Sequence, residues 1–155
     1  MSENKEKVLE NICLALEDLD IQHDNIGLDK LSTRFAVKSK DIPILLKIEV
    51  LEKEETVRLT SRLPLLVPKE KRFAFCMAVN IINCGCKLGS FGFSFKTGIL
   101  IFKSQACYKN AQLSKEVYKY MIENARISID KYNEVLFKLS KGHISLRDFF
   151  KMNEF

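Results

Sequence analysis

Apolar residues recur at steps of three and four between Lys5 and about Ile21, at the start of the chain. This spacing gathers them on one side of a helix and is typical of an amphipathic helix that packs on a core. The pattern therefore predicts an N-terminal helix that ends in the polar segment around Gly27. The apolar stripe consists of Val8, Leu9, Ile12, Cys13, Ala15, Leu16 and Leu19.

The period changes to two in the next part of the chain. A short segment, residues 33–40, is followed by two segments rich in branched apolar residues, 42–52 and 56–65, which a polar turn separates. From Val57 to Arg62, apolar or small residues alternate with arginine and threonine. This pattern predicts an antiparallel meander of three strands with one face in contact with solvent.

A second helix, predicted over residues 68–84, has apolar side chains on almost all sides. Pro68 suits its first position, where a missing N–H costs nothing. A helix that is apolar all round must be covered on more than one face, and one sheet can cover only one. We expect one stripe to pack on the sheet of the same chain. This stripe is formed by Phe73, Cys76, Met77, Ile81 and Cys84.

The opposite stripe of this helix needs another cover, which the first or the third helix could supply. A second copy of the same helix, related by a two-fold axis, is the cover that we favour, because an isologous contact matches like patches. We therefore expect a homodimer whose interface contains Phe75, Ala78, Val79 and Ile82.

Two asparagines, Asn80 and Asn83, lie three residues apart on this otherwise apolar helix. A buried amide must find hydrogen-bond partners. We therefore expect a structural polar pair in which each side chain ties the helix end to a neighbouring strand or loop. Contact with a ligand is the alternative role.

A hairpin follows, in which phenylalanine occupies every second position over residues 91–95. A two-residue turn at Thr97-Gly98 would place Phe95 opposite Leu100. One face of the hairpin then becomes a continuous apolar surface directed inward. Its expected members are Phe91, Phe93, Phe95, Leu100 and Phe102.

A long amphipathic helix is predicted from Ser114, a candidate N-cap, to Gly142, which is a suitable stop. A short amphipathic segment follows at residues 145–152. The order α-βββ-α-ββ-α predicts an α+β fold with an antiparallel sheet flanked by helices. Since neither a repeat nor a linker divides the sequence, we expect one domain over residues 1–155, with a short helical extension at about 144–155.

Composition narrows the classes of function. Residues 1–30 hold eight acidic and three basic side chains, a net charge of −5, whereas the remainder holds 12 acidic and 22 basic ones, a net charge of +10. An acidic segment folded back on a basic body, a basic surface for an anionic partner, or merely solvated helix faces would each explain this asymmetry. Because aromatic residues are not interleaved with the lysines, we do not expect nucleic acid as a partner.

The expected location is the cytoplasm. No apolar stretch approaches the ~18–20 residues that span a bilayer, and the N-terminus lacks the basic start and apolar centre of a signal peptide. The five cysteines are an odd number without disulfide-framework spacing, so reduced thiols are expected.

The sharpest chemical candidate is Cys84-Gly85-Cys86. A structural zinc site usually needs two close pairs of ligands, and the second pair is missing here. We interpret the segment as a helix exit, in which Gly85 takes a positive φ and both thiols are small buried hydrophobes. Neither His23 nor His143 has a nucleophile at motif spacing, and the glycines match no phosphate-binding loop. We therefore expect neither metal, cofactor nor catalytic activity.

The stretch from Leu63 to Ser104 carries an ordered set of features that points to a family. They are Leu63-Pro64, Val67-Pro68 with Lys71-Arg72, Asn80 with Asn83, Leu88-Gly89-x-Phe91 and Gly98. In this set, and over about residues 31–140, the chain resembles the YbjN family, also labelled putative bacterial sensory transduction regulators. The resemblance implies a fold like that of type III secretion chaperones, often dimeric, and no established catalytic activity.

The function expected from these observations is that of a non-enzymatic cytoplasmic protein-binding module, an adaptor or regulator of unknown partner. It would add a partner's strand to a sheet edge or take apolar side chains into a groove. One alternative is a chaperone-like protein that binds an extended client segment. Another is an enzyme whose site is assembled from scattered residues.

Overall fold

The two-residue alternation predicted from the sequence forms five strands in the computed structural model, which describes residues 2–41 and 43–152. All neighbouring strands are antiparallel, and their order across the sheet is β1-β2-β3-β5-β4. The predicted α+β class and element order are therefore confirmed. The strands are β1 (Ser32–Val37), β2 (Ile44–Leu51), β3 (Thr56–Leu66), β4 (Ser90–Phe93) and β5 (Ile99–Cys107).

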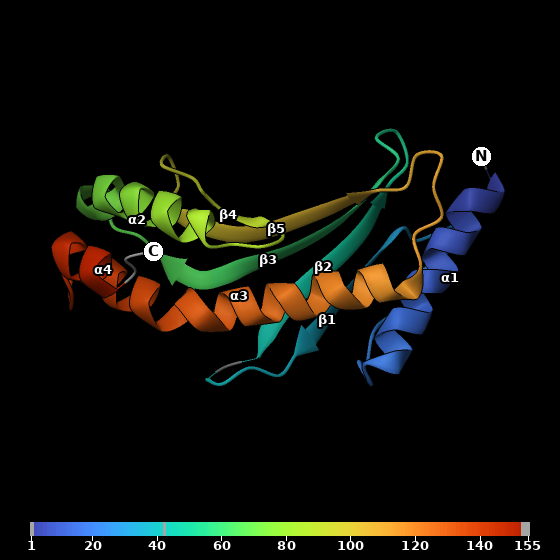
Figure 1. The fold of residues 1–155 in the computed structure, drawn as a ribbon, viewed down its shortest axis with the longest axis horizontal. Helices are drawn as coiled ribbons and strands as arrows, with labels where there is room; N and C mark the ends of the chain where they lie inside the picture. The colour runs from blue at the N-terminus through green and yellow to red at the C-terminus, as the bar shows by residue number, and fades with distance from the viewer. Residues whose placement is uncertain (1, 42, 153–155) are drawn as a thin grey trace.

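The helices cover one face of this sheet (Figure 1). They are α1 (Ser2–Asp18), the 3-10 turn η1 (Lys69–Lys71), α2 (Arg72–Cys84), α3 (Lys115–Lys141) and α4 (Leu146–Met152). The long helix α3 runs beneath the sheet, α1 packs at its beginning, and α2 and α4 gather at its end. At Gly142 the backbone is left-handed, with φ of 77°, which ends α3 at the predicted residue. Among the described residues, no helix combines the length and apolar character that crossing a bilayer requires.

The core lies between the sheet and α3. Alternate residues of every strand point toward the helices and are buried, whereas the residues between them face away from the helices. Phe91 joins the two layers, since its ring lies 5.2 Å from the Phe102 ring and 6.0 Å from the Tyr132 ring of α3, both edge-on. This aromatic contact fixes the β4–β5 hairpin on the long helix.

The acidic α1 is tied to the start of α3. The carboxylate of Asp18 accepts from Lys115 Nζ at 2.8 Å and from Lys119 Nζ at 3.2 Å, and these hydrogen bonds lower the pKa of Asp18. In addition, Asn11 Nδ2 donates to the Leu113 carbonyl oxygen at 3.0 Å. Part of the acidic N-terminal segment therefore folds back on the basic remainder of the chain. This contact is the first of the three explanations offered above for the uneven charge.

The predicted register of the hairpin is wrong by two residues. Phe93, rather than Phe95, lies opposite Leu100, because the turn is longer than two residues and is closed by a bond from Gly98 N–H to the Ser94 carbonyl at 2.7 Å. An even shift keeps each strand residue on its predicted face. Phe95, however, is displaced into the turn, where 58% of it is exposed.

The assignment of the two apolar stripes on α2 is also wrong. The expected dimer contacts, Phe75, Ala78, Val79 and Ile82, are buried within the chain itself. The physical reason is that α2 packs against β4, α3 and α4, which cover it from several sides. The stripe expected to face the sheet instead points outward, with 73% of Phe73 and 43% of Met77 exposed. A dimer would need a surface other than the four residues predicted.

Candidate functional site

The two edges of the sheet, β1 and β4, differ in how their backbone groups are satisfied. An edge strand presents a row of N–H and C=O groups that can pair with another chain. The sheet edges are therefore the first places to look for the expected mode of binding.

Asn83 of α2 caps the β4 edge at Phe91. Its side-chain Nδ2 donates to the Phe91 carbonyl oxygen at 2.9 Å, and its Oδ1 accepts from the Phe91 N–H at 2.8 Å. One amide thus satisfies both outward backbone groups of Phe91, as a neighbouring strand would. Asn83 ties the helix end to a strand, as predicted. For Asn80 the prediction is wrong, because its side chain is exposed; its backbone carbonyl oxygen accepts a weak bond from Cys84 Sγ at 3.5 Å.

The β1 edge is open. The Val50 N–H donates to the Leu31 carbonyl oxygen at 2.8 Å, just before β1 begins. Because hydrogen-bonded pairs alternate in an antiparallel ladder, residues 33, 35 and 37 direct their backbone groups toward β2. Those of Ser32, Arg34 and Ala36 point away from the sheet.

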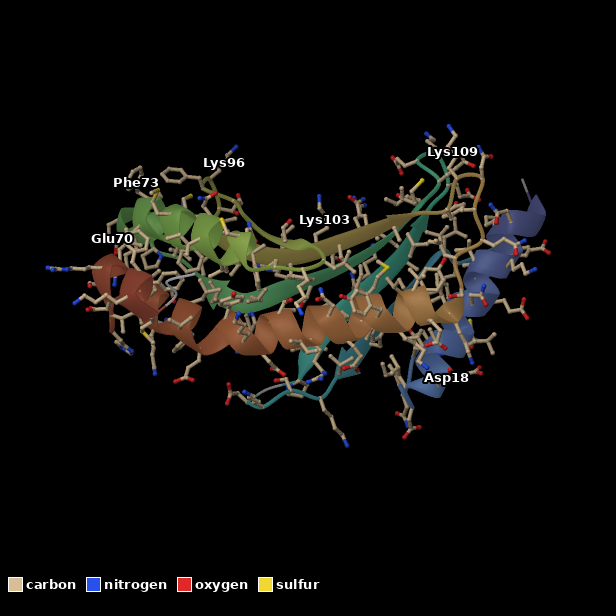
Figure 2. All side chains as sticks on the ribbon, viewed as in Figure 1. Asp18, Glu70, Phe73, Lys96, Lys103 and Lys109 are labelled. Atoms are coloured by element: carbon tan, nitrogen blue, oxygen red, sulfur yellow. The ribbon has the colours of Figure 1, made fainter. Side chains whose placement is uncertain are left out.

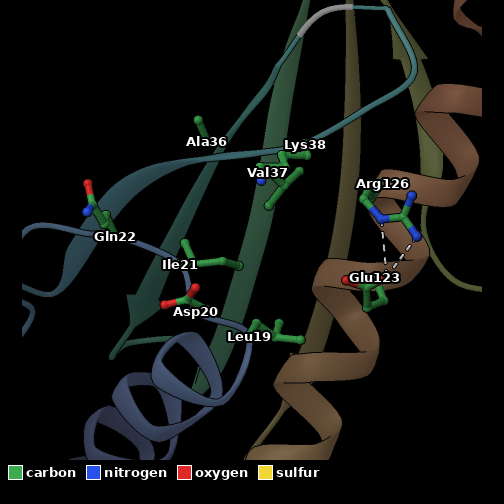
Figure 3. A pocket seen from close by; sticks show the side chains of 9 residues that line it. All are labelled: Leu19, Asp20, Ile21, Gln22, Ala36, Val37, Lys38, Glu123 and Arg126. Carbon is green, nitrogen blue, oxygen red and sulfur yellow. Dashed lines mark hydrogen bonds and ion pairs between the residues drawn. The ribbon is translucent and has the colours of Figure 1, made fainter.

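A groove of about 670 Å³ lies beside the end of β1, between the segment after α1 and the middle of α3 (Figure 3). Its apolar lining is contributed by Leu19, Ile21, Ala36 and Val37, and its charged lining by Asp20, Lys38, Glu123 and Arg126. An apolar floor with a few polar groups at the rim is typical of a binding site.

Arg126 is held in position at the wall of this groove. Its Nη2 lies 2.9 Å from Glu123 Oε2, and its Nη1 lies 3.4 Å from Asp130 Oδ2. On the opposite side, Asp20 adopts a positive φ of 53° and turns the chain out of α1. The rim therefore carries charges of both signs around an apolar floor, which suits a polypeptide better than a single type of ion.

The cysteine pair does not form a site of this kind. Gly85 has a φ of −95°, so the expected positive φ is wrong, and Cys84 is exposed rather than buried. Cys86 is half-buried, and burial raises the pKa of its thiol. Within residues 2–41 and 43–152, no group of three His, Cys, Asp or Glu side chains is arranged to hold a metal ion.

Replacing Asn83 by leucine is expected to destabilise the fold by about 1–3 kcal/mol, because both outward backbone groups of Phe91 lose their partner. The matched control is Asn80→Leu, three residues earlier on the same helix and exposed, which is expected to change stability by no more than about 0.5 kcal/mol. Urea denaturation followed by circular dichroism measures both. Equal midpoints for the two variants would contradict this role of Asn83.

The open edge and the groove could not be found from sequence motifs. The groove is built from residues 19–22, 36–38 and the middle of α3, which are far apart in the chain. The available signal was the short, polar first strand, whose pattern is that of an edge strand.

The family comparison agrees with the sequence-based resemblance. Residues 9–138 match the family described as "YbjN: Putative bacterial sensory transduction regulator", and the resemblance is confirmed over a longer stretch than predicted. No curated protein sequence matches the chain significantly.

Among the solved structures, the following contain chains of similar fold. A chain from "Crystal structure of YbjN, a putative transcription regulator from E. coli" is 12% identical with a TM-score of 0.54, and the match covers 81% of this chain and 91% of that one. For a chain of the ExsC-ExsE complex the identity is 14%, the TM-score 0.54 and the coverage 84% and 93%. For a chain of the HopA1-SchA Chaperone-Effector Complex the identity is 16% and the TM-score 0.56, and the match covers 86% of this chain and 98% of that one. The predicted chaperone-like fold is thereby confirmed.

Proposed function

The chain belongs to the YbjN family, and we propose that it is a non-enzymatic protein-binding module that pairs an extended segment of a partner with the open edge of β1. The observation that carries this proposal is the contrast between the two sheet edges. Asn83 caps the β4 edge at Phe91, whereas β1 directs the backbone groups of Ser32, Arg34 and Ala36 outward beside a groove.

Strand addition at β1 would use both features together. Backbone hydrogen bonds to the six-residue strand supply affinity that is independent of sequence. Because side chains alternate along a strand, every second side chain of the added segment would point toward the groove side of the sheet. The apolar floor of Leu19, Ile21 and Val37 would then select its side chains.

A chaperone-like role is the form of this function that the structural comparisons favour. One similar chain comes from a chaperone–effector complex and another from a complex of two proteins. In such a role the extended segment would belong to a dedicated client. All five cysteines are free thiols, which supports our proposal that the protein acts in the cytoplasm.

We further propose that the working form is a homodimer, now through the outward stripe of α2. Phe73 and Met77 are large apolar residues exposed to 73% and 43%. Phe95 lies next to this helix, because Arg72 Nη1 donates to the Phe95 and Lys96 carbonyl oxygens at 2.9 and 2.8 Å. An exposed apolar patch of this kind marks an interaction surface.

The edge proposal is tested with Ala36→Pro and its matched control Ala36→Val. Proline removes the outward N–H of residue 36 and is tolerated at an edge strand, whereas valine keeps the N–H and suits a strand. Proteins retained from a lysate of the native host are quantified by mass spectrometry for wild type and both variants. We expect the wild type and Ala36→Val to retain the same proteins and Ala36→Pro to lose them. Equal retention by all three would overturn strand addition at β1.

A further inference from the structure

The face of the sheet opposite α3 is strongly basic. Five outward strand positions carry cations, and in the described strands Glu49 is the one acidic residue directed to this side. The cationic residues are Arg34, Lys47, Arg58, Arg62 and Lys103. Figure 2 shows Lys103 projecting from β5 on the side away from α3. We refer to these residues, with their outward neighbours, as the open face.

The register of the strands aligns part of this charge into one row. Arg34 lies opposite Lys47, Lys47 opposite Thr60, and Thr60 opposite Lys103. A single line of side chains therefore crosses from β1 to β5. Neighbouring strands are about 4.8 Å apart, so the three strand spacings in this row extend over about 14 Å.

A second row, two residues along the strands, adds apolar side chains. Ala36 lies opposite Leu45, and Arg62 lies opposite Ile101. Leu45 is 69% exposed and Ile101 is 36% exposed, although both lie within a sheet. The open face thus places apolar contacts directly beside the row of positive charge.

The charge on this face is not neutralised within the chain. Glu49 pairs with Lys47 and, at 2.7 Å from Oε1 to Nη2, with Arg58. Burial acts to raise the pKa of Glu49, but the hydrogen bonds from Lys47 and Arg58 outweigh it and lower the pKa, so Glu49 stays ionised. Among the described residues, no ion pair reaches the other three cations, Arg34, Arg62 and Lys103. Placing Arg34 directly opposite Lys47 is unfavourable for the isolated sheet.

We propose that the open face binds an acidic polypeptide segment that also carries apolar side chains. The proposal rests on the protein-binding function above and adds the chemistry of the partner. Carboxylates would pair with Arg34, Arg62 and Lys103, and apolar side chains would cover Leu45 and Ile101. A nucleic acid fits less well, because the outward positions of the five described strands carry no aromatic side chain on which bases could stack. Glu49 would also repel phosphates.

The experiment uses a fluorescein-labelled peptide of about twelve residues, long enough to cross the row in extended form, with alternating glutamate and valine or threonine. A second peptide has glutamine in place of every glutamate. The protein variant combines Arg34→Gln, Arg62→Gln and Lys103→Gln. The matched control combines Lys7→Gln, Lys69→Gln and Lys151→Gln, which removes the same charge from exposed positions elsewhere. Thermal melts establish that both variants fold.

Fluorescence anisotropy is expected to show binding of the acidic peptide that weakens about tenfold in the open-face variant and stays unchanged in the control variant. The glutamine peptide should bind about tenfold more weakly than the acidic one, and added salt should remove the difference. Equal binding by the open-face and control variants would overturn the proposal. So would equal binding of the two peptides, or tighter binding of an oligothymidine of similar length.

Failure here is separable from failure of strand addition at β1. If Ala36→Pro loses its host partners while the open-face variant still binds the acidic peptide, the edge proposal stands and the open-face proposal falls. If the open-face variant loses the acidic peptide while Ala36→Pro keeps every host partner, the open-face proposal stands and the edge proposal falls.

Discussion

Val79→Asp is expected to lower the free energy of unfolding by about 4 kcal/mol, because it places an unpaired carboxylate in an apolar environment. Val79 is 6% exposed and lies on the side of α2 that faces the rest of the chain. An isolated buried charge has neither water nor a counter-ion to stabilise it. Urea denaturation followed by circular dichroism measures the loss.

The matched control is Met77→Asp, which adds the same charge two residues earlier on the outward side of the same helix. With 43% of Met77 exposed, its effect on the stability of the single folded chain should stay within about 0.5 kcal/mol. Light scattering on this variant also tests the dimer. We expect wild-type protein at twice the chain mass of 17.9 kDa and Met77→Asp at the chain mass. A wild-type urea midpoint for Val79→Asp would show that the α2 stripe containing Val79 is not buried. Wild-type protein at the mass of a single chain would exclude the dimer.

Phe102→Ala is expected to destabilise the protein by about 3–5 kcal/mol, as truncation of a core aromatic residue does. The Phe102 side chain is fully buried and contacts Phe91, which in turn contacts Tyr132 of α3. The variant removes the centre of the contact between the hairpin and the long helix. The urea midpoint and the far-ultraviolet spectrum report the change.

Phe95→Ala is the control for the same residue type, and it tests the corrected register directly. Since Phe95 lies in the turn and is 58% exposed, its truncation should cost the single folded chain no more than about 0.5 kcal/mol in stability. If both alanine variants lost equal stability, Phe95 would be an inward residue and the two-residue turn expected from the sequence would be right.

The secondary structure could be predicted because each element has a clear period. The strand at 56–66 and the helix at 115–141 lie close to where alternation and helical spacing place them. The register of the hairpin could not be predicted. The expected turn of two residues and the observed turn of four, residues 95–98 between the bonded pair Ser94 and Ile99, both keep Phe91 and Phe93 on the same face as Phe102 and Leu100.

The orientation of α2 was beyond prediction for a different reason. Both stripes are apolar, so the choice between them depends on which other elements reach the helix. That choice is made by α4, a seven-residue helix whose Phe149 is fully buried and which packs against α2 and α3. The open face was visible in the sequence as alternating arginines and threonines, but its row of charge exists only once the strands are in register.

The amide of Asn83 also limits the number of sheet edges at which another chain can add. A sheet with two unpaired edges can add chains at both ends and polymerise into a fibre, whereas a sheet with one such edge can accept a single strand and then stop. By occupying the backbone groups of Phe91, Asn83 blocks the middle of the four-residue strand β4. Under the function proposed above, a single open edge would let the chain accept an extended segment without polymerising.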